Sequence, residues 1–139
     1  MKQKLSVVKI GGNLIEDAEG FKHVLELFSK MNENKILVHG GGKKATELAN
    51  QLGVESKMVN GRRITNAETL DIALMVYGGL VSKKIVAKLQ ALGTDAIGMS
   101  GADANAIKAH KRPKKNVDFG YVGDVDMVNT YGIFKLLQA

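Results

Sequence analysis

Val7-Val8-Lys9-Ile10-Gly11-Gly12-Asn13 is a short apolar run that ends in two glycines, and Ile36-Leu37-Val38-His39-Gly40-Gly41-Gly42-Lys43 repeats the pattern. A strand that runs into consecutive glycines lets backbone N–H groups approach an anion that a Cβ atom would block. A helix that follows adds partial positive charge at its N-terminus. We therefore expect two neighbouring strands that open onto one phosphate or carboxylate site. Lys9 makes that site electrostatic and favours phosphoryl transfer over a structural role.

The residues around these runs predict an α/β fold with a mainly parallel sheet between layers of helices. Residues 5–10 and 35–38 are expected to be strands, and residues 17–31 carry apolar side chains at helical spacing between them. Two strands joined by a helix form a right-handed unit with parallel strands. A further helix is expected over residues 43–52, with Gly53 closing it.

The middle of the chain predicts a hairpin and then a long helix. Asn60-Gly61 is a strong signal for a two-residue hairpin turn, which we interpret as a flap. Thr65 and Glu68 have the spacing of a capping box, with Thr65 as the N-cap. The helix is expected to run to about Leu92. Its central pair Gly78-Gly79 predicts close packing against a helix or the sheet, or a dimer contact.

The C-terminal part predicts three more elements. Residues 95–99 are expected to form a third strand of the main sheet, and residues 106–109 and 119–128 a second hairpin. Residues 129–138 are expected to form a helix. Because no repeat or linker is visible, the sequence predicts a single domain over residues 1–139.

Composition limits the classes of function. The chain of 139 residues has no cysteine, so disulfides, thiolate metal sites and cysteine nucleophiles are excluded. The N-terminal apolar run is too short for a signal peptide or a membrane span, and a cytoplasmic protein is expected. The net charge is +6, but the basic residues are scattered in pairs and aromatic residues are few. A small anionic substrate therefore explains the charge about as well as nucleic acid does.

Several motifs allow more than one interpretation. Lys9 could reach solvent from the strand end or point at a phosphate. Gly40-Gly41-Gly42-Lys43-Lys44-Ala45 matches a loose dinucleotide-binding pattern. His39-Gly40-Gly41-Gly42 and Ser100, with His110 and Asp124 as partners, approach a hydrolase pattern, although the order of the acid and histidine is wrong for it.

Two further sets of charged residues stay open. Arg62 and Arg63 are adjacent on one strand of the hairpin, so only one of them can face a site. Spacing alone does not choose between them. Asp103, Asp124 and Asp126 show no clear clustering, and the sequence assigns no metal ligand.

Essentially the whole chain resembles the amino acid kinase family, and within it the acetylglutamate kinases. The motifs that carry the resemblance are Lys9-Ile10-Gly11-Gly12, His39-Gly40-Gly41-Gly42, Asn60-Gly61-Arg62-Arg63-Ile64-Thr65, Met75-Val76-Tyr77-Gly78-Gly79 and residues 118–125. The first two motifs are shared by the wider family. The hairpin motif is the more specific mark of the acetylglutamate branch.

The resemblance implies a role for each matching residue. Lys9 would stabilise the transferring phosphoryl group, and Gly11 and Gly12 would approach the terminal phosphate of ATP, which Mg²⁺ would accompany. Gly41 and Gly42 would bind N-acetyl-L-glutamate through backbone N–H groups. Arg63 would hold the α-carboxylate of that substrate, under the hairpin as a lid.

The resemblance also implies what the chain would do. The parent reaction would phosphorylate the side-chain carboxylate of N-acetyl-L-glutamate in arginine biosynthesis, in a homodimer or higher homo-oligomer without nucleic acid or membrane. Enzymes of the family are roughly twice this length, so the chain is expected to be the N-terminal lobe without the nucleotide-binding lobe, and inactive alone. The alternatives are a non-catalytic ligand-binding or dimerisation module, and a kinase for another acylated diacid such as N-succinylglutamate.

Overall fold

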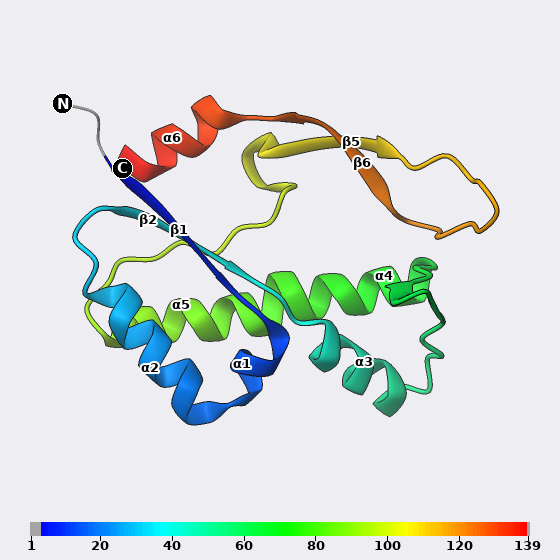
Figure 1. Ribbon diagram of the computed structural model, residues 1–139, viewed down its shortest axis with the longest axis horizontal. Coiled ribbons are helices and arrows are strands. Elements are labelled where there is room, and N and C mark those ends of the chain that lie inside the picture. Colours follow the sequence, from blue (N-terminus) through cyan, green and yellow to red (C-terminus); the bar gives the residue numbers. More distant parts are fainter. Residues whose placement is uncertain (1–3, 139) are drawn as a thin grey trace.

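The computed structural model describes residues 4–138, and its centre is a pair of parallel strands (Figure 1). Strand β1 (Leu5–Ile10) pairs with β2 (Asn34–His39) in register from Leu5 opposite Asn34 to Ile10 opposite His39. Both expected strands are confirmed, and β2 is one residue longer at each end. Side chains alternate along β1, so Val8 and Ile10 face the core while Val7 and Lys9 face outward.

Two helices connect these strands. The sequence pattern missed α1 (Gly12–Glu16), which begins directly at the first glycine turn. The predicted amphipathic helix is α2 (Ala18–Ser29), whose first turn is capped by the Asp17 carboxylate accepting from the N–H of Gly20 at 3.2 Å. Its buried face consists of Phe21, Leu25 and Phe28.

Helix α3 and the first hairpin follow the prediction. Helix α3 (Gly42–Gln51) buries Ala45 and Ala49 completely, and Gly53 turns the chain after it with a φ of 71°. Strands β3 (Met58–Val59) and β4 (Arg62–Arg63) are antiparallel. Asn60 and Gly61 both have positive φ, as a type I′ turn requires.

Three consecutive helical segments form one long helical rod. It comprises α4 (Ala67–Ala73), the π-helical segment η1 (Leu74–Val81) and α5 (Ser82–Ala91), and Gly93 ends it with a φ of 76°. Thr65 as N-cap is wrong, because Asn66 Oδ1 accepts from the N–H of Thr69 at 2.9 Å. The backbone of Thr65 pairs with residues 119–121 instead.

The expected packing at Gly78 and Gly79 does not occur within the chain. Apart from the adjacent residues and the backbone of the same helix, no described atom lies within 4 Å of the position of a Cβ at either residue. The neighbouring Leu74, Met75 and Leu80 of η1 are also exposed. The dimer contact that the same pair suggested stays a prediction.

The third strand expected over residues 95–99 is wrong for this structure. These residues form no regular element and pair with no strand among the described residues. Their backbone lies against α5, where the Lys83 ammonium donates to the carbonyl of Gly98 and a Cβ at Gly98 would overlap the Ser82 hydroxyl. Ile97 points to solvent and is 73% exposed. An apolar run of this length forms a strand only where a neighbouring strand satisfies its backbone.

The last elements were predicted, with shifted bounds. After a 3₁₀ turn, η2 (Asp103–Asn105), strands β5 (Ile107–Lys111) and β6 (Gly123–Val128) form an antiparallel hairpin. Residues 119–122 belong to its loop rather than to a strand. Helix α6 (Thr130–Gln138) ends the described chain, and the Asn129 amide oxygen accepts from the N–H of Gly132 at its start.

Helices lie on both sides of the β1–β2 pair, which confirms the α/β class. Helices α1 to α5 lie on one side, and α6 lies with the β5–β6 hairpin on the other (Figure 1). The core is formed between the inner face of the strands and the first group of helices; its buried members are Ile10, Phe21, Leu25, Phe28, Ala45, Ala49, Ile72, Val76, Val81, Ile85 and Leu89. Residues 1–3 and 139 of the expected single domain lie outside the described residues.

Candidate functional site

The two glycine turns lie side by side at one edge of the sheet. Since β1 and β2 are parallel and in register, Gly11 and Gly40 leave the sheet together. The N–H of Gly40 donates to the carbonyl of Ile10 at 3.2 Å, and a Cβ on Gly40 would lie 3.6 Å from the backbone nitrogen of Gly12. The two turns therefore form one continuous backbone surface.

That surface presents backbone N–H groups at two helix starts. Gly11 is the N-cap of α1 and Gly41 the N-cap of α3, so neither cap supplies a side chain to the first turn of its helix. The space where Cβ atoms would stand on Gly11 and Gly12 is open to at least 4 Å. The ten-residue helix α3 also contributes the positive end of its dipole. This arrangement is suited to binding an anion.

An ion pair joins the start of α3 to the end of α1. The Lys43 ammonium in the first turn of α3 contacts the Glu16 carboxylate at the end of α1. The hydrogen bond that Lys43 donates to the Glu16 carboxylate raises the pKa of Lys43. Its charge is directed toward Glu16 rather than toward the glycine turns.

Lys9 lies one residue before the end of β1 and faces away from the core. Its side chain is exposed, and within residues 4–138 it forms no salt bridge or hydrogen bond. The charge is thus available to a ligand at the strand end. The reaction role expected for Lys9 stays a prediction.

Arg63, not Arg62, reaches the glycine turns. Its Nη2 donates to the Thr46 hydroxyl at 2.6 Å and to the carbonyl of Gly42 at 3.1 Å. The Thr46 hydroxyl donates in turn to the Gly42 carbonyl at 3.0 Å. Nη1 of Arg63 is buried and has no hydrogen-bond partner. A guanidinium is thus held over the N-terminus of α3 with one donor nitrogen unused.

Sequence reasoning missed two residues that contact this site. Thr46 lies one turn into α3, where a threonine usually has no special meaning, and only the reach of Arg63 gives it a role. Tyr77 belongs to η1, and a Cβ on Gly41 would lie 3.3 Å from its ring and one on Gly42 3.3 Å from its hydroxyl. Two signals for Tyr77 were its place in the Met75–Gly79 motif and its polar hydroxyl in an otherwise apolar segment.

The residues of the hydrolase pattern do not come together. The Ser100 hydroxyl donates to Asp103 at 2.8 Å, and the backbone N–H of Ser100, bonded to the same carboxylate, lowers the pKa of Asp103. His110 pairs with Asp126 at 2.6 Å, and Asp124 pairs with Arg112. His39 contacts the carbonyl of Gly40 through Nδ1 at 2.9 Å. Each residue thus has a local structural partner.

The described residues contain neither a metal-binding cluster nor a membrane-spanning helix. Within residues 4–138, no group of three or more His, Asp and Glu side chains could hold a metal ion. None of the helices in that range is long and apolar enough to cross a bilayer.

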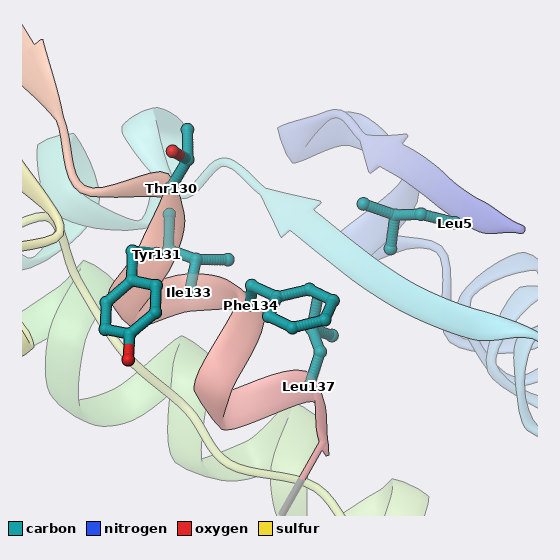
Figure 2. Close-up of a pocket in the computed structure, with 6 residues that line it drawn as sticks. All are labelled: Leu5, Thr130, Tyr131, Ile133, Phe134 and Leu137. Carbon is teal, nitrogen blue, oxygen red and sulfur yellow. The ribbon is translucent and has the colours of Figure 1, made fainter. Parts of the chain in front are cut away.

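A separate apolar cavity of about 510 Å³ lies at the opposite end of β1 from the glycine turns (Figure 2). It is formed between Leu5 at the start of β1 and one face of α6, from Thr130 to Leu137. It contains no charged group among its lining residues. It is therefore not part of the anion-binding surface.

Comparison with known proteins agrees with this fold. Residues 4–139 match the amino acid kinase family. The chain belongs to the amino acid kinase family, as the motifs indicated.

Two of its curated relatives are acetylglutamate kinases. The chain is 59% identical to the acetylglutamate kinase of Phocaeicola vulgatus, over 99% of this chain and 54% of that protein. It is 38% identical to the acetylglutamate kinase of Methanopyrus kandleri, over 97% of this chain and 54% of that protein. The chain therefore spans about half the length of the curated relatives it matches.

Solved structures share the fold. The crystal structure of smu.665 from Streptococcus mutans superimposes with a TM-score of 0.80 and 26% identity, covering 96% of this chain and 54% of that one. N-acetylglutamate synthase from Neisseria gonorrhoeae, in complex with coenzyme A and N-acetyl-glutamate, gives a TM-score of 0.76 at 22% identity, covering 99% of this chain and 32% of that one.

Proposed function

We propose that this chain is the acyl-amino-acid-binding half of an acetylglutamate kinase. The complete enzyme would transfer the γ-phosphoryl group of ATP to the side-chain carboxylate of N-acetyl-L-glutamate, as a step of arginine biosynthesis. Membership of the family and the name shared by the relatives support this proposal. The relatives are twice as long, and the remaining half would supply the adenine site and further catalytic charge.

The observation that carries the proposal is the unused donor of Arg63. A buried guanidinium nitrogen without a partner is costly unless a ligand satisfies it. Beside it, α3 offers unpaired backbone N–H groups. A carboxylate accepts well from both, and Arg favours carboxylates because its planar fork matches them. Arg63 would hold the α-carboxylate of N-acetyl-L-glutamate, with Gly41 and Gly42 binding through their backbones.

The other glycine turn would bind the phosphoryl group. Gly11 and Gly12 leave room for a phosphate to approach the backbone, and Lys9 would offset the negative charge that develops on its oxygens. The acceptor carboxylate is already ionised at neutral pH, so the reaction needs no general base. Catalysis then depends on positioning and on charge stabilisation, which lysine and backbone N–H groups provide.

Among the described residues there is space for the phosphates of ATP but no cluster of side chains for Mg²⁺. The open space at Gly11 and Gly12 fits a nucleotide phosphate. The described residues include no cluster suited to a metal, and we assign no protein ligand to Mg²⁺. When bound to nucleotide phosphates, as is usual for this ion, Mg²⁺ neutralises part of their charge.

Further protein would cover two exposed apolar surfaces. The outer face of the central strands exposes Leu5, Val7 and Val38, and η1 exposes Leu74 and its neighbours. Surfaces of this kind commonly mark protein contacts. We propose that the other half of the enzyme and a second copy of the chain are the partners, in a homodimer or higher homo-oligomer. The cytoplasmic location expected from the sequence stays a prediction.

Calorimetric titration of the 139-residue chain with N-acetyl-L-glutamate tests the substrate. L-glutamate and N-succinyl-L-glutamate serve as comparison ligands, and saturable binding is expected for the acetyl compound most strongly. Arg63→Lys keeps the charge and removes the fork, and should weaken binding about tenfold because a charge-assisted hydrogen bond is lost. Arg62→Lys is the matched control, because Arg62 does not reach the glycine turns, and should leave binding unchanged.

The results of these titrations distinguish the proposed function from its alternatives. Equal losses in the Arg62 and Arg63 variants would contradict the carboxylate role of Arg63. Preference for the succinyl ligand would favour the other kinase activity, and association without ligand binding would favour a dimerisation module. A coupled ADP-release assay should detect little turnover from this chain alone, because part of the charge stabilisation is absent and about 1.4 kcal/mol already changes a rate tenfold.

A further inference from the structure

A second cavity lies between the β3–β4 hairpin and the loop of the β5–β6 hairpin, and it is rich in positive charge. Its volume is about 570 Å³, and its lining residues are Arg62, His110, Arg112, Pro113, Lys115, Val117, Phe119 and Asp124. Figure 1 shows the β5–β6 loop passing above the start of α4, next to the hairpin. Arg62 and Arg63 are neighbours on β4 and point to opposite sides. The cavity is therefore separate from the glycine turns.

Backbone hydrogen bonds hold the two walls of this cavity together. The N–H of Thr65 donates to the carbonyl of Phe119 at 2.9 Å, and the N–H of Tyr121 donates to the carbonyl of Thr65 at 2.7 Å. Between them, Gly120 approaches Thr65 so closely that a Cβ would overlap the Thr65 carbonyl. The loop is thus fastened to the base of the hairpin, and the cavity is preformed.

The charges of the lining residues do not cancel. Arg112 donates from Nε and Nη2 to Asp124 Oδ1 at 2.9 and 2.6 Å, and this pair is internally neutral. His110 has its own partner in Asp126. Arg62 and Lys115 form no hydrogen bond or salt bridge with any described residue. Lys115 also acts on Asp124 through space, so this one carboxylate faces Arg62, Arg112 and Lys115, and these four groups keep a net charge of +2.

We propose that this cavity binds a small phosphate monoester with an apolar body. A phosphate monoester carries a charge of about −1.5 to −2 at pH 7, which matches the net charge of these four groups. The Arg62 fork suits two phosphate oxygens, and Lys115 adds a point charge. Pro113, Val117 and Phe119 form the apolar part of the lining and would contact the body of the ligand. The glycine turns take no part in this site.

Phenyl phosphate is the probe that tests this site, by calorimetric titration of the whole chain at low ionic strength. Inorganic phosphate supplies the charge without the ring, and phenol supplies the ring without the charge. Phenyl phosphate is expected to bind more tightly than either. Arg62→Gln and Lys115→Gln should each weaken it about tenfold, since each removes one charge-assisted contact. Lys114→Gln removes an equal charge from a neighbour outside the lining and should have little effect.

Three results would overturn the proposal. Phenyl phosphate could show no saturable binding, or Lys114→Gln could weaken it as much as Arg62→Gln does. Binding could also be lost in Lys9→Gln but kept in Arg62→Gln, which would locate the anion at the glycine turns. Arg62→Lys is the second variant, and an intermediate affinity in it supports the fork. Amide NMR spectra of each variant confirm that the hairpin is intact, and shifts confined to residues 62 and 110–124 support the site.

Discussion

At Gly120, the loop between β5 and β6 lies directly against Thr65 at the base of the β3–β4 hairpin. The φ angle of Gly120 is 74°, a backbone conformation that residues other than glycine rarely adopt. The Thr65 carbonyl oxygen also occupies the position that a Cβ atom would take. Gly61 has the same φ of 74° but has open space around it. Substitutions at Gly61 therefore test the cost of backbone strain alone, and substitutions at Gly120 test strain together with steric overlap.

Replacing each of these glycines by alanine should have different costs. Gly61→Ala is expected to cost about 1–2 kcal/mol, the usual penalty for a left-handed residue. Gly120→Ala adds the overlap with Thr65 and should cost roughly 3 kcal/mol or more. The free energy of unfolding in urea measures both. Equal costs would contradict the close approach of the loop to Thr65.

At the scale of elements, two features of the long helix formed by α4, η1 and α5 matter. These are the N-cap at its start and the π-helical segment in its middle. Asn66 caps α4, and η1 directs Tyr77 toward the Gly41–Gly42 turn. π-helical turns are frequent at functional sites because they re-aim side chains. The rod thus joins the base of the hairpin to the anion-binding surface.

The cap of α4 can be tested directly. Asn66→Ala should lower the free energy of unfolding by about 1 kcal/mol, because the N–H of Thr69 loses its acceptor. Asn66→Asp keeps the acceptor and should retain the stability. Thr65→Val removes only the hydroxyl and leaves the backbone pairing in place. If Thr65→Val lowered the free energy of unfolding in urea more than Asn66→Ala does, Thr65 would be the N-cap and this assignment would be contradicted.

At the scale of the whole molecule, surface carboxylates are paired in several separate places. A hydrogen bond from Ser6 lowers the pKa of Glu33, one from Lys44 lowers that of Glu47, and one from Arg112 lowers that of Asp124. A carboxyl with a lowered pKa in the folded state binds its proton less readily than in the unfolded chain. Its contribution to stability is present above the unfolded pKa and is lost as the pH falls through the folded pKa.

The protein should therefore lose stability in acid. The urea midpoint is expected to fall between pH 5 and pH 3, because unfolded carboxyl groups titrate near roughly pH 4. Asp124→Asn removes one of these groups and should make the fall smaller. A midpoint at pH 3 equal to that at pH 5 would contradict the pairing.

The sequence by itself determined the elements whose signals are local. The strands that end in glycine turns, the Asn60-Gly61 hairpin and the amphipathic helices follow from spacing and turn chemistry, which act between near neighbours. The family and the order of the site motifs were readable for the same reason. The local pattern also gave one wrong prediction. The apolar run at residues 95–99 has the sequence pattern of a strand whether or not a neighbouring strand pairs with it.

Only the tertiary structure decided what depends on distant partners. It brought Arg63 rather than Arg62 to Thr46 and Gly42, occupied the backbone of Thr65 with residues 119–121, and laid Tyr77 against the glycine turn. Among residues 4–138, it also places no strand beside residues 95–99. Each of these outcomes rests on contacts between residues far apart in the chain, which no local periodicity encodes.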